Sequence, residues 1–305
     1  MRVGFIGIGN MGFAMMARLR AQGWPVGVHD IDTRRMADAV ALGAAPYPSP
    51  AALAAASDAL VVVVVDAGQV DSVRFGPAGA AAVLRPGATV LLCPTVGPAD
   101  VERVAARLSA VGIGCIDAPM SGGPVRARDG SMSLMLACDD AVFERCRGLV
   151  EALSSKVFRI GARPGDGART KLVNNLLAAV NLAGAAEALA LAARIGLDPA
   201  RTLAVIQASS GQSWIGTDRL ARALAADTQV GAHLALLAKD SALALAMAHD
   251  AAVPLAVGSA AAAVYAEALA QGLGRADDSV LYRRALDVSP ALSVPPAPAG
   301  AESAP

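Results

Sequence analysis

The chain has 305 residues, which suits about two domains. Its 26 basic and 26 acidic side chains give a formal net charge of zero, and no basic stripe is present, so the composition argues against nucleic acid as the main partner. Hydrophobic residues make up 55% of the chain and aromatic residues only 3%, which predicts a core built from alanine, leucine and valine.

The first elements predict a dinucleotide site. Val3–Ile6 has the pattern of a short buried strand, and Met11–Ala21 continues with helical periodicity. Between them, Gly7, Gly9 and Gly12 have the G-x-G-x-x-G spacing, in which the glycines permit a tight turn, a close approach of the backbone to a pyrophosphate, and close packing of helix on strand. The free N–H groups of the helix N-terminus would face the phosphates. An ordinary turn between strand and helix is the alternative.

An acidic residue follows the second predicted strand, Pro25–His29. Asp30 lies 18 positions beyond Gly12, where a carboxylate accepts hydrogen bonds from the adenosine ribose and repels a 2′-phosphate. This favours NAD over NADP as the cofactor. Arg34 and Arg35 lie just downstream and could hold a phosphate, although we expect them on a solvated helix face.

Strands and helices continue to alternate up to residue 160. We expect helices at Thr33–Leu42, Pro50–Ala56 and about Pro98–Val111, and strands at Leu60–Val65, Thr89–Cys93, Gly114–Asp117, Met132–Ala137 and Val157–Ile160. Uninterrupted apolar runs are typical of parallel strands that are covered on both faces. The first part of the chain, residues 1–162, is therefore predicted to be an α/β domain with a doubly wound sheet of the Rossmann type, which binds ligands at the carboxyl ends of its strands.

The pattern changes to helices after Gly161. We expect helices at Ala168–Ile195, Pro199–Ala208, Trp214–Ala225, Leu234–Asp250 and Pro254–Gln271. Residues 163–288 are thus predicted to be an all-α domain for substrate binding and dimerisation. Residues 289–305 are rich in proline and alanine, and we expect them to be disordered.

No metal site is predicted, because neither the cysteines nor the histidines have a metal-ligand spacing. These residues are Cys93, Cys115, Cys138 and Cys146, and His29, His233 and His249. Free thiols favour a reducing compartment. The N-terminus opens on a strand without signal-peptide anatomy, so we expect the protein in the cytoplasm. The longest apolar stretch, Leu176–Ala193, contains Asn181 and Glu187, which favours a buried core helix over a membrane span.

Two further segments contain candidate catalytic groups. Residues 117–124 follow a predicted strand, and Ser121, Gly122 and Gly123 offer a hydroxyl and backbone N–H groups that can hold a carboxylate; an ordinary Gly-Gly turn is equally compatible with them. In residues 165–175, Lys171 and Asn175 are four apart and so share a helix face.

The helix around Lys171 is otherwise apolar. Desolvation would lower the lysine pKa and make a neutral amine available as a base. The alternative is a lysine at the rim of an apolar helix, with its amine in water. Asn174 lies beside the same face. Lys239 is placed in a second apolar helix and is one of only three lysines in the chain.

Taken together, these motifs resemble the β-hydroxyacid dehydrogenase family, which includes 3-hydroxyisobutyrate dehydrogenases and 6-phosphogluconate dehydrogenases. The resemblance covers about residues 1–287. It rests on the glycine loop at 4–12, Asp-Ala-Pro-Met-Ser-Gly-Gly at 117–123, Gly-x-Gly-x-x-x-Lys-x-x-x-Asn at 165–175, Lys239-Asp240, and Gly-x-Gly-x-x-Asp-x-Ser at 272–279. Within the family, the segments at 65–70, 185–194, 213–215 and 275–279 are most similar to the enzymes of four-carbon sugar acids.

The resemblance implies roles for individual residues. Lys171 would be the general acid/base, and Asn175 and Ser121 would be the other catalytic residues. The implied substrate contacts are Ser121, Gly122, Gly123, Asn174 and Lys239. The implied cofactor contacts are Gly7, Ile8, Gly9, Asn10, Met11, Gly12, Asp30, Val65, Thr95 and Lys239.

Three positions depart from the commoner family pattern. Val65-Asp66 replaces Leu-Pro, the stretch Pro124–Arg128 replaces a smaller, glycine-containing one, and Asn174 stands where some sugar-acid enzymes have histidine. Arg126 and Arg128 would either bind an anionic substrate or lie on the surface.

The implied reaction is a reversible NAD-dependent oxidation of the 3-hydroxyl of a small hydroxy acid, such as L-threonate, 3-hydroxyisobutyrate or D-glycerate. Two alternatives remain: an imine reductase on the same scaffold, whose members usually lack the lysine, and a non-catalytic dinucleotide-binding protein. No membrane partner is expected. The long apolar helices predict a homodimer or homotetramer.

Overall fold

The computed structural model describes residues 1–76 and 78–287. The chain forms two compact units. The first comprises residues 1–180 and 229–277, and the second comprises residues 181–228 together with the chain from residue 278 onward. The division falls inside one long helix. The domain boundary predicted at residue 162 marks where the sequence pattern changes from strands to helices, and it stays a prediction. The disorder expected at residues 289–305 lies outside the described residues.

The first unit is built on a nine-stranded sheet. Its strands are β1 (Val3–Ile6), β2 (Val26–His29), β3 (Ala45–Pro46), β4 (Ala59–Val62), β5 (Thr89–Leu92), β6 (Gly114–Asp117), β7 (Met120–Ser121), β8 (Ser133–Ala137) and β9 (Lys156–Gly161). The spatial order is β3-β2-β1-β4-β5-β6-β8-β7, and β9 pairs with β8. Strands β1 to β6 are parallel, whereas β8 is antiparallel to β6. The order reverses at β1, next to which β2 and β4 lie, so the predicted doubly wound sheet is confirmed.

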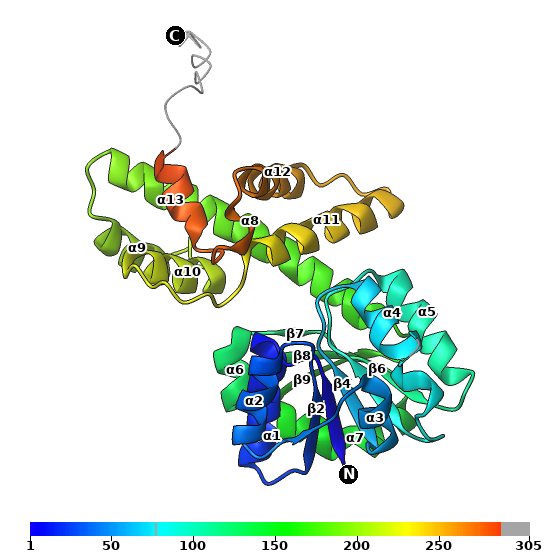
Figure 1. The fold of residues 1–305 in the computed structure, drawn as a ribbon. Helices are drawn as coiled ribbons and strands as arrows, with labels where there is room; N and C mark the ends of the chain where they lie inside the picture. The colour runs from blue at the N-terminus through cyan, green and yellow to red at the C-terminus, as the bar shows by residue number, and fades with distance from the viewer. Residues whose placement is uncertain (77, 288–305) are drawn as a thin grey trace, which may run out of the picture. The chain divides into compact units, whose positions relative to one another are not determined.

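Helices cover both faces of this sheet (Figure 1). They are α1 (Asn10–Ala21), α2 (Thr33–Ala41), α3 (Pro50–Ala55), α4 (Ala67–Phe75), α5 (Pro98–Ser109), α6 (Gly123–Asp129) and α7 (Asp140–Leu153), with a 3-10 turn η1 at Ala80–Ala82. One apolar core lies under α1, α6 and α7, and contains Phe5, Met15 and Leu149. The other lies under α3, α4 and α5, and contains Leu60, Val70 and Leu108.

The expected strand Leu60–Val65 is shorter in the structure, because β4 ends at Val62. Beyond that point the chain passes over the glycine loop, where a Cβ on Gly7 would lie 2.6 Å from the carbonyl oxygen of Val63. Of the valines that follow, Val63 still donates its N–H to the carbonyl of Ile6 in β1 at 2.8 Å, and Val65 is half-exposed.

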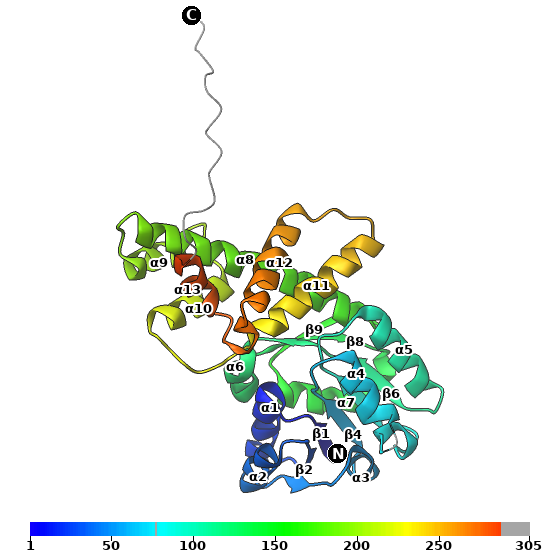
Figure 2. The ribbon, with the colours of Figure 1, turned by 45° about the horizontal axis from the view of Figure 1, so that its top comes forward.

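The remaining helices are α8 (Asp166–Arg194), α9 (Pro199–Gln207), α10 (Trp214–Leu224), α11 (Leu234–Asp250), α12 (Ala256–Ala270) and α13 (Val280–Asp287), with a 3-10 turn η2 at Leu273–Arg275. In the first unit, α11 and α12 pack side by side (Figure 2), and the Tyr265 hydroxyl donates to the carbonyl of Ala179 in α8. The second unit contains the end of α8 with α9, α10 and α13, and has a buried ion pair between Arg219 and Asp278. A helical second half after the sheet is therefore confirmed.

Helix α8 is long and apolar enough to cross a membrane by length and composition alone, with a mean hydropathy of 1.8 over 18 residues. Core helices also satisfy this criterion. Leu172, Leu182 and Leu189 on one side of α8 are fully buried within the chain.

Candidate active site

The glycine loop between β1 and α1 has space and donors for a pyrophosphate. Gly7 has a φ of +85°, and a Cβ on Gly12 would lie 2.2 Å from the carbonyl oxygen of Gly7, so both positions require glycine for the fold. Gly9 differs, because a Cβ there would meet no atom within 4 Å. Gly9 is also the N-cap of α1 and places no side chain on its N–H groups. Open space beside uncapped amides fits a dinucleotide pyrophosphate.

Asp30 fixes the loop from the end of β2. One carboxylate oxygen accepts from the N–H of Ile8 at 2.6 Å and the other from the N–H of Asp32 at 2.9 Å. The guanidinium of Arg35 donates to the side-chain oxygen of Asn10 at 2.8 Å. Arg35 therefore lies against the glycine loop, whereas the sequence placed it on a solvated helix face. Met11, also predicted at the cofactor, packs against the core.

Lys171 lies in the second turn of α8, and 7% of its surface is exposed. Burial lowers the pKa of its amine to about 8, because the charged form loses hydration. The carboxylate of Asp240 opposes this shift, and the ammonium of Lys239 adds to it. Lys171 can therefore gain and lose a proton close to neutral pH.

A chain of polar contacts begins at Asn175, one helical turn after Lys171, and includes the two residues whose charges act on the Lys171 amine. The Asn175 amide donates to Asp240 at 2.6 Å, and the other oxygen of Asp240 is 2.9 Å from the amine of Lys239. The same amine donates to the carbonyl of Thr95, which follows β5. The side chain of Asn174 donates to the oxygen of Asn175 at 3.1 Å. Helices α8 and α11 and the edge of the sheet thus supply one connected cluster.

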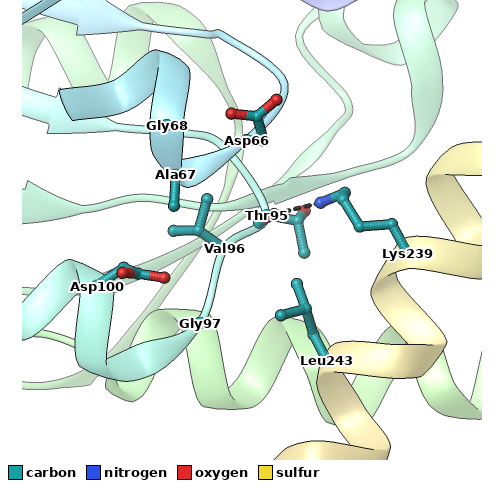
Figure 3. A pocket seen from close by; sticks show the side chains of 9 residues that line it. All are labelled: Asp66, Ala67, Gly68, Thr95, Val96, Gly97, Asp100, Lys239 and Leu243. Atoms are coloured by element: carbon teal, nitrogen blue, oxygen red, sulfur yellow. Dashed lines mark hydrogen bonds between the residues drawn. The ribbon is translucent and has the colours of Figure 1, made fainter. Parts of the chain in front are cut away.

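A cavity of about 290 Å³ lies beside this cluster (Figure 3). Its lining comes from the start of α4, the start of α5 and one side of α11, and comprises Asp66, Ala67, Gly68, Thr95, Val96, Gly97, Asp100, Lys239 and Leu243. The amine of Lys239 reaches across the cavity to Thr95 (Figure 3). Val65 precedes the lining and is half-exposed, and its N–H donates to Gln69. Asp66, at the position where the family has proline, caps α4 by accepting from the N–H of Gln69.

Ser121 lies at the end of β7 and is half-buried. Gly122 and Gly123 have φ values of +129° and +74° and turn the chain into α6. Among the described residues, the Ser121 hydroxyl makes no hydrogen bond to the polar cluster around Lys171. The structure thus brings together Lys171, Asn174, Asn175, Lys239 and Thr95, and gives no contact between them and residues 121–123.

The sequence interpretation assigned no role to Asp240. This carboxylate is 6% exposed and contacts both Asn175 and Lys239. A signal was present, because an aspartate next to a lysine is unusual in an otherwise apolar helix. Its partner Asn175 is 65 residues away, and sequence spacing within one helix does not reveal such a contact.

Comparison with known proteins places these features in a family. Residues 2–161 match the NAD-binding domain of 6-phosphogluconate dehydrogenase, and residues 165–285 match the NAD-binding domain of NADP-dependent 3-hydroxyisobutyrate dehydrogenase. L-threonate dehydrogenase of Cupriavidus necator is 36% identical over 96% of this chain and 97% of its own.

Solved structures agree with this placement. A 3-hydroxyisobutyrate dehydrogenase from Salmonella typhimurium superposes with a TM-score of 0.87 at 34% identity, over 93% of this chain and 99% of its own. Psf3 in complex with NADP+ superposes with a TM-score of 0.86 at 27% identity, over 92% and 99%.

The fold and these relatives define an NAD(P)-dependent oxidoreductase that acts on a hydroxyl group. More narrowly, the chain belongs to the β-hydroxyacid dehydrogenase family, in the branch of the 3-hydroxyisobutyrate dehydrogenases, and resembles the L-threonate dehydrogenases.

Proposed function

We propose that the protein oxidises the 3-hydroxyl of a small hydroxy acid with NAD, and that Lys171 is the general acid/base. The observation that carries the proposal is the buried amine of Lys171, whose pKa of about 8 suits proton transfer near neutral pH. The amine lies in a cluster with two carboxamides, a carboxylate and a second amine, and such a cluster serves proton transfer better than fold stability.

When bound, NAD supplies the acceptor for the hydride that leaves the hydroxyl-bearing carbon. The neutral amine of Lys171 takes the hydroxyl proton as the carbonyl forms, and the ammonium returns this proton in the reverse reaction. Asn175 orients the substrate hydroxyl, and Asp240 holds the amide of Asn175 in place at 2.6 Å. Asn174 and Lys239 contact the substrate from the same side.

The substrate carboxylate binds at Ser121, Gly122 and Gly123 in this proposal. Positive φ values at both glycines turn successive N–H groups toward one side of the chain, a geometry that suits an anion. L-threonate, 3-hydroxyisobutyrate and D-glycerate are the candidate substrates, in that order. Absorbance at 340 nm over a panel of hydroxy acids, with NAD and NADP in turn, identifies the substrate, and no turnover with any acid in the panel would contradict the proposal.

NAD is the preferred cofactor because the Asp30 carboxylate lies at the end of β2, where a 2′-phosphate would be repelled. The guanidinium of Arg35 is engaged by the side-chain oxygen of Asn10 at 2.8 Å. A fluorescence titration should give tighter binding of NADH than of NADPH. Much tighter binding of NADPH would show that Arg35 overrides Asp30.

The substitution Lys171→Ala tests the mechanism. We expect kcat to fall by about 10²- to 10⁴-fold, the usual contribution of a general acid/base, while the Kd for NADH stays unchanged. Lys156→Ala is the matched control, because Lys156 is an exposed lysine on the edge strand β9. Near-full activity of Lys171→Ala would remove the lysine from the mechanism.

We also propose that the enzyme is cytoplasmic and forms a homodimer or homotetramer. Support for the assembly comes from α8, which exposes the large apolar side chains of Val173, Leu177 and Leu191 and is followed by the exposed Ile195.

A further inference from the structure

Asp117 is a buried carboxylate to which the reaction above gives no role. It is the last residue of β6 and is 1% exposed. One of its oxygens accepts from the N–H of Gly165 at 2.9 Å and from the N–H of Ala168 at 3.0 Å. The N–H of Gly167 is a further donor to this carboxylate. These amides belong to the start of α8, so a side chain of the sheet caps the helix that contains Lys171.

The two glycines before Lys171 fit this cap. A Cβ on Gly167 would lie 2.9 Å from the carboxylate carbon of Asp117 and 2.7 Å from the carbonyl oxygen of Met135 in β8. Gly165 has a φ of +95°, which a residue with a side chain rarely adopts. The Gly-x-Gly spacing therefore lets the first turn of α8 approach the ends of β6 and β8 as closely as backbone permits.

We propose that Asp117 is a positioning residue for the reaction: it anchors the first turn of α8 to the sheet edge and thereby sets where the amine of Lys171 lies. This inference rests on the proposed role of Lys171. Lys171 comes three residues after Ala168, which is about 4.5 Å along the helix. Because the helix is rigid over this short distance, a shift of the first turn moves the amine of Lys171 by a similar amount.

The charge of Asp117 suits this role. Burial raises the pKa of its carboxyl to about 6, and the amides of Ala168, Gly165 and Gly167 oppose that shift. At neutral pH the carboxylate is ionised and faces the positive end of the helix dipole, where a negative charge is favourable. Glu102 of α5 pairs with Arg169 at 2.6 Å and holds the outer side of the same turn.

Two variants disturb the cap in different ways. Asp117→Asn keeps the shape and removes the charge, and Gly167→Ala keeps the carboxylate but forces the turn away from it. We expect both to lower kcat by about 10- to 100-fold, because small displacements of a catalytic group have effects of this size. The Kd for NADH should stay unchanged, since the glycine loop lies elsewhere in the sheet. The pKa that governs oxidation should rise, because a displaced amine regains hydration.

Two matched controls test whether the effects are specific to the cap. One removes a carboxylate elsewhere, and the other replaces a glycine elsewhere. Asp166→Asn removes a carboxylate from the same helix end, where Asp166 is half-buried and pairs with Arg163 and Arg169. Gly148→Ala adds a methyl group on the exposed side of α7, where a Cβ meets no atom within 4 Å. Both controls should retain the kcat and pH profile of the unmodified enzyme.

Hydrogen exchange at residues 165–172 reports on the cap without any turnover. We expect faster exchange there in Asp117→Asn and Gly167→Ala and unchanged exchange in both controls. Unchanged kcat and pH profile in both cap variants, with a lower melting temperature, would overturn the inference and leave Asp117 as a stabilising cap alone. An equal loss of kcat in Asp166→Asn would also overturn it. If Lys171→Ala keeps its activity, the proposed function fails, and the exchange data still show whether Asp117 holds the turn.

Discussion

At the scale of single residues, the sequence predicted most of the polar side chains of the site, but it did not predict which of them contact one another. Lys171 and Asn175 were predicted on one helix face because helical spacing determines which residues of one helix are neighbours. Asp240 and the contact from Lys239 to Thr95 were not predicted, because they join segments 65 and 144 residues apart. Such contacts depend on how helices pack on the sheet, which a single sequence does not encode locally.

The buried amine of Lys171 gives the reaction a defined dependence on pH. Its pKa is about 8, and oxidation requires the neutral amine. We expect kcat for oxidation to rise from pH 7 to 9 and then level off, and kcat for reduction to fall over the same range. Steady-state rates in both directions measure this. Rates that do not vary between pH 7 and 9 would contradict an amine as acid/base.

The charge of Asp240 should determine the pH at which the oxidation rate reaches half of its maximum. Its carboxylate raises the pKa of Lys171 against the effect of burial. Asp240→Asn keeps the shape of the side chain and removes the charge, so the midpoint for oxidation should move below that of the unmodified enzyme. Asp250→Asn is the matched control at the exposed end of the same helix. A midpoint that stays in place in Asp240→Asn would show that the two groups do not interact.

At the scale of elements, most strands and many helices could be predicted, including the short helix α3 at Pro50–Ala55. Helices α4, α6, α13 and the 14-residue α7 were not predicted. The expected bounds of β1, β6 and α11 agree with the structure. Helix α6 was missed because it begins at Gly123-Pro124, a dipeptide typical of turns, and has seven residues. Helix α4 was missed because Gly68 lies in its first turn. In both, packing on the sheet outweighs weak local propensity.

The glycine loop combines positions that serve the fold with one that serves the cofactor. Gly12→Ala would place a Cβ 2.2 Å from the Gly7 carbonyl oxygen, so we expect it to destabilise the protein by at least about 1–3 kcal/mol. Gly9→Ala meets no protein atom, so we expect it to destabilise the protein by about 1 kcal/mol or less, because alanine is a poorer N-cap residue than glycine. It should nevertheless weaken NADH binding by about tenfold or more, because its methyl group occupies the space for the pyrophosphate.

Thermal melting and an NADH fluorescence titration of Gly9→Ala and Gly12→Ala check this division. Gly9→Ala with normal NADH affinity would show that the pyrophosphate lies elsewhere.

Several of the described helices end in the same hydrogen-bonded turn, whose left-handed position is occupied by glycine in some and by alanine in others. The residue after the C-cap is in the left-handed region at Gly196 of α8 and at Ala226 and Ala252, which follow α10 and α11. After α11, the N–H of Val253 donates to the carbonyl of Ala248, as expected for a Schellman motif. A left-handed conformation costs an alanine about 1–2 kcal/mol, part of which is offset by its lower entropy in the unfolded chain.

Ala252→Gly should therefore stabilise the protein by about 0.5–1 kcal/mol, and Gly196→Ala should destabilise it by a similar amount. Differential scanning calorimetry measures both changes. One substitution introduces glycine at the left-handed position and the other removes it, so the two should change the free energy of unfolding in opposite directions. Changes of the same sign would refute backbone strain as the cause.

At the scale of the whole molecule, composition and length indicated two parts, and the structure locates a continuous helix that belongs to both compact units. Sequence patterns mark where strands give way to helices, near residue 162. They do not mark how a long helix divides its contacts between neighbours. Which side chains of α8 stay exposed therefore becomes visible only in the folded chain. These exposed side chains are the basis of the proposed assembly.

Helix α8 exposes large apolar side chains near each of its ends. Val173 and Leu177 are four residues apart in the first unit, and Leu191 and Ile195, the residue that follows the helix, are four residues apart in the second. Each of these four side chains is at least 60% exposed. Exposed apolar neighbours of this kind exceed the isolated apolar residues normal on a monomer. A second copy of the chain covers them in our proposal, because homodimers commonly pair the same surface twofold.

Light scattering should therefore give about twice or four times the chain mass of 30.5 kDa. The double substitution Leu191→Glu, Ile195→Glu places two charges among the apolar side chains at the end of α8, so we expect a shift toward the monomer, because burying an unpaired carboxylate is costly. Val205→Glu is the control, since Val205 is 64% exposed and lies in α9. A monomeric mass for the unmodified protein, or an assembly unaffected by both charges, would show that these side chains have another role.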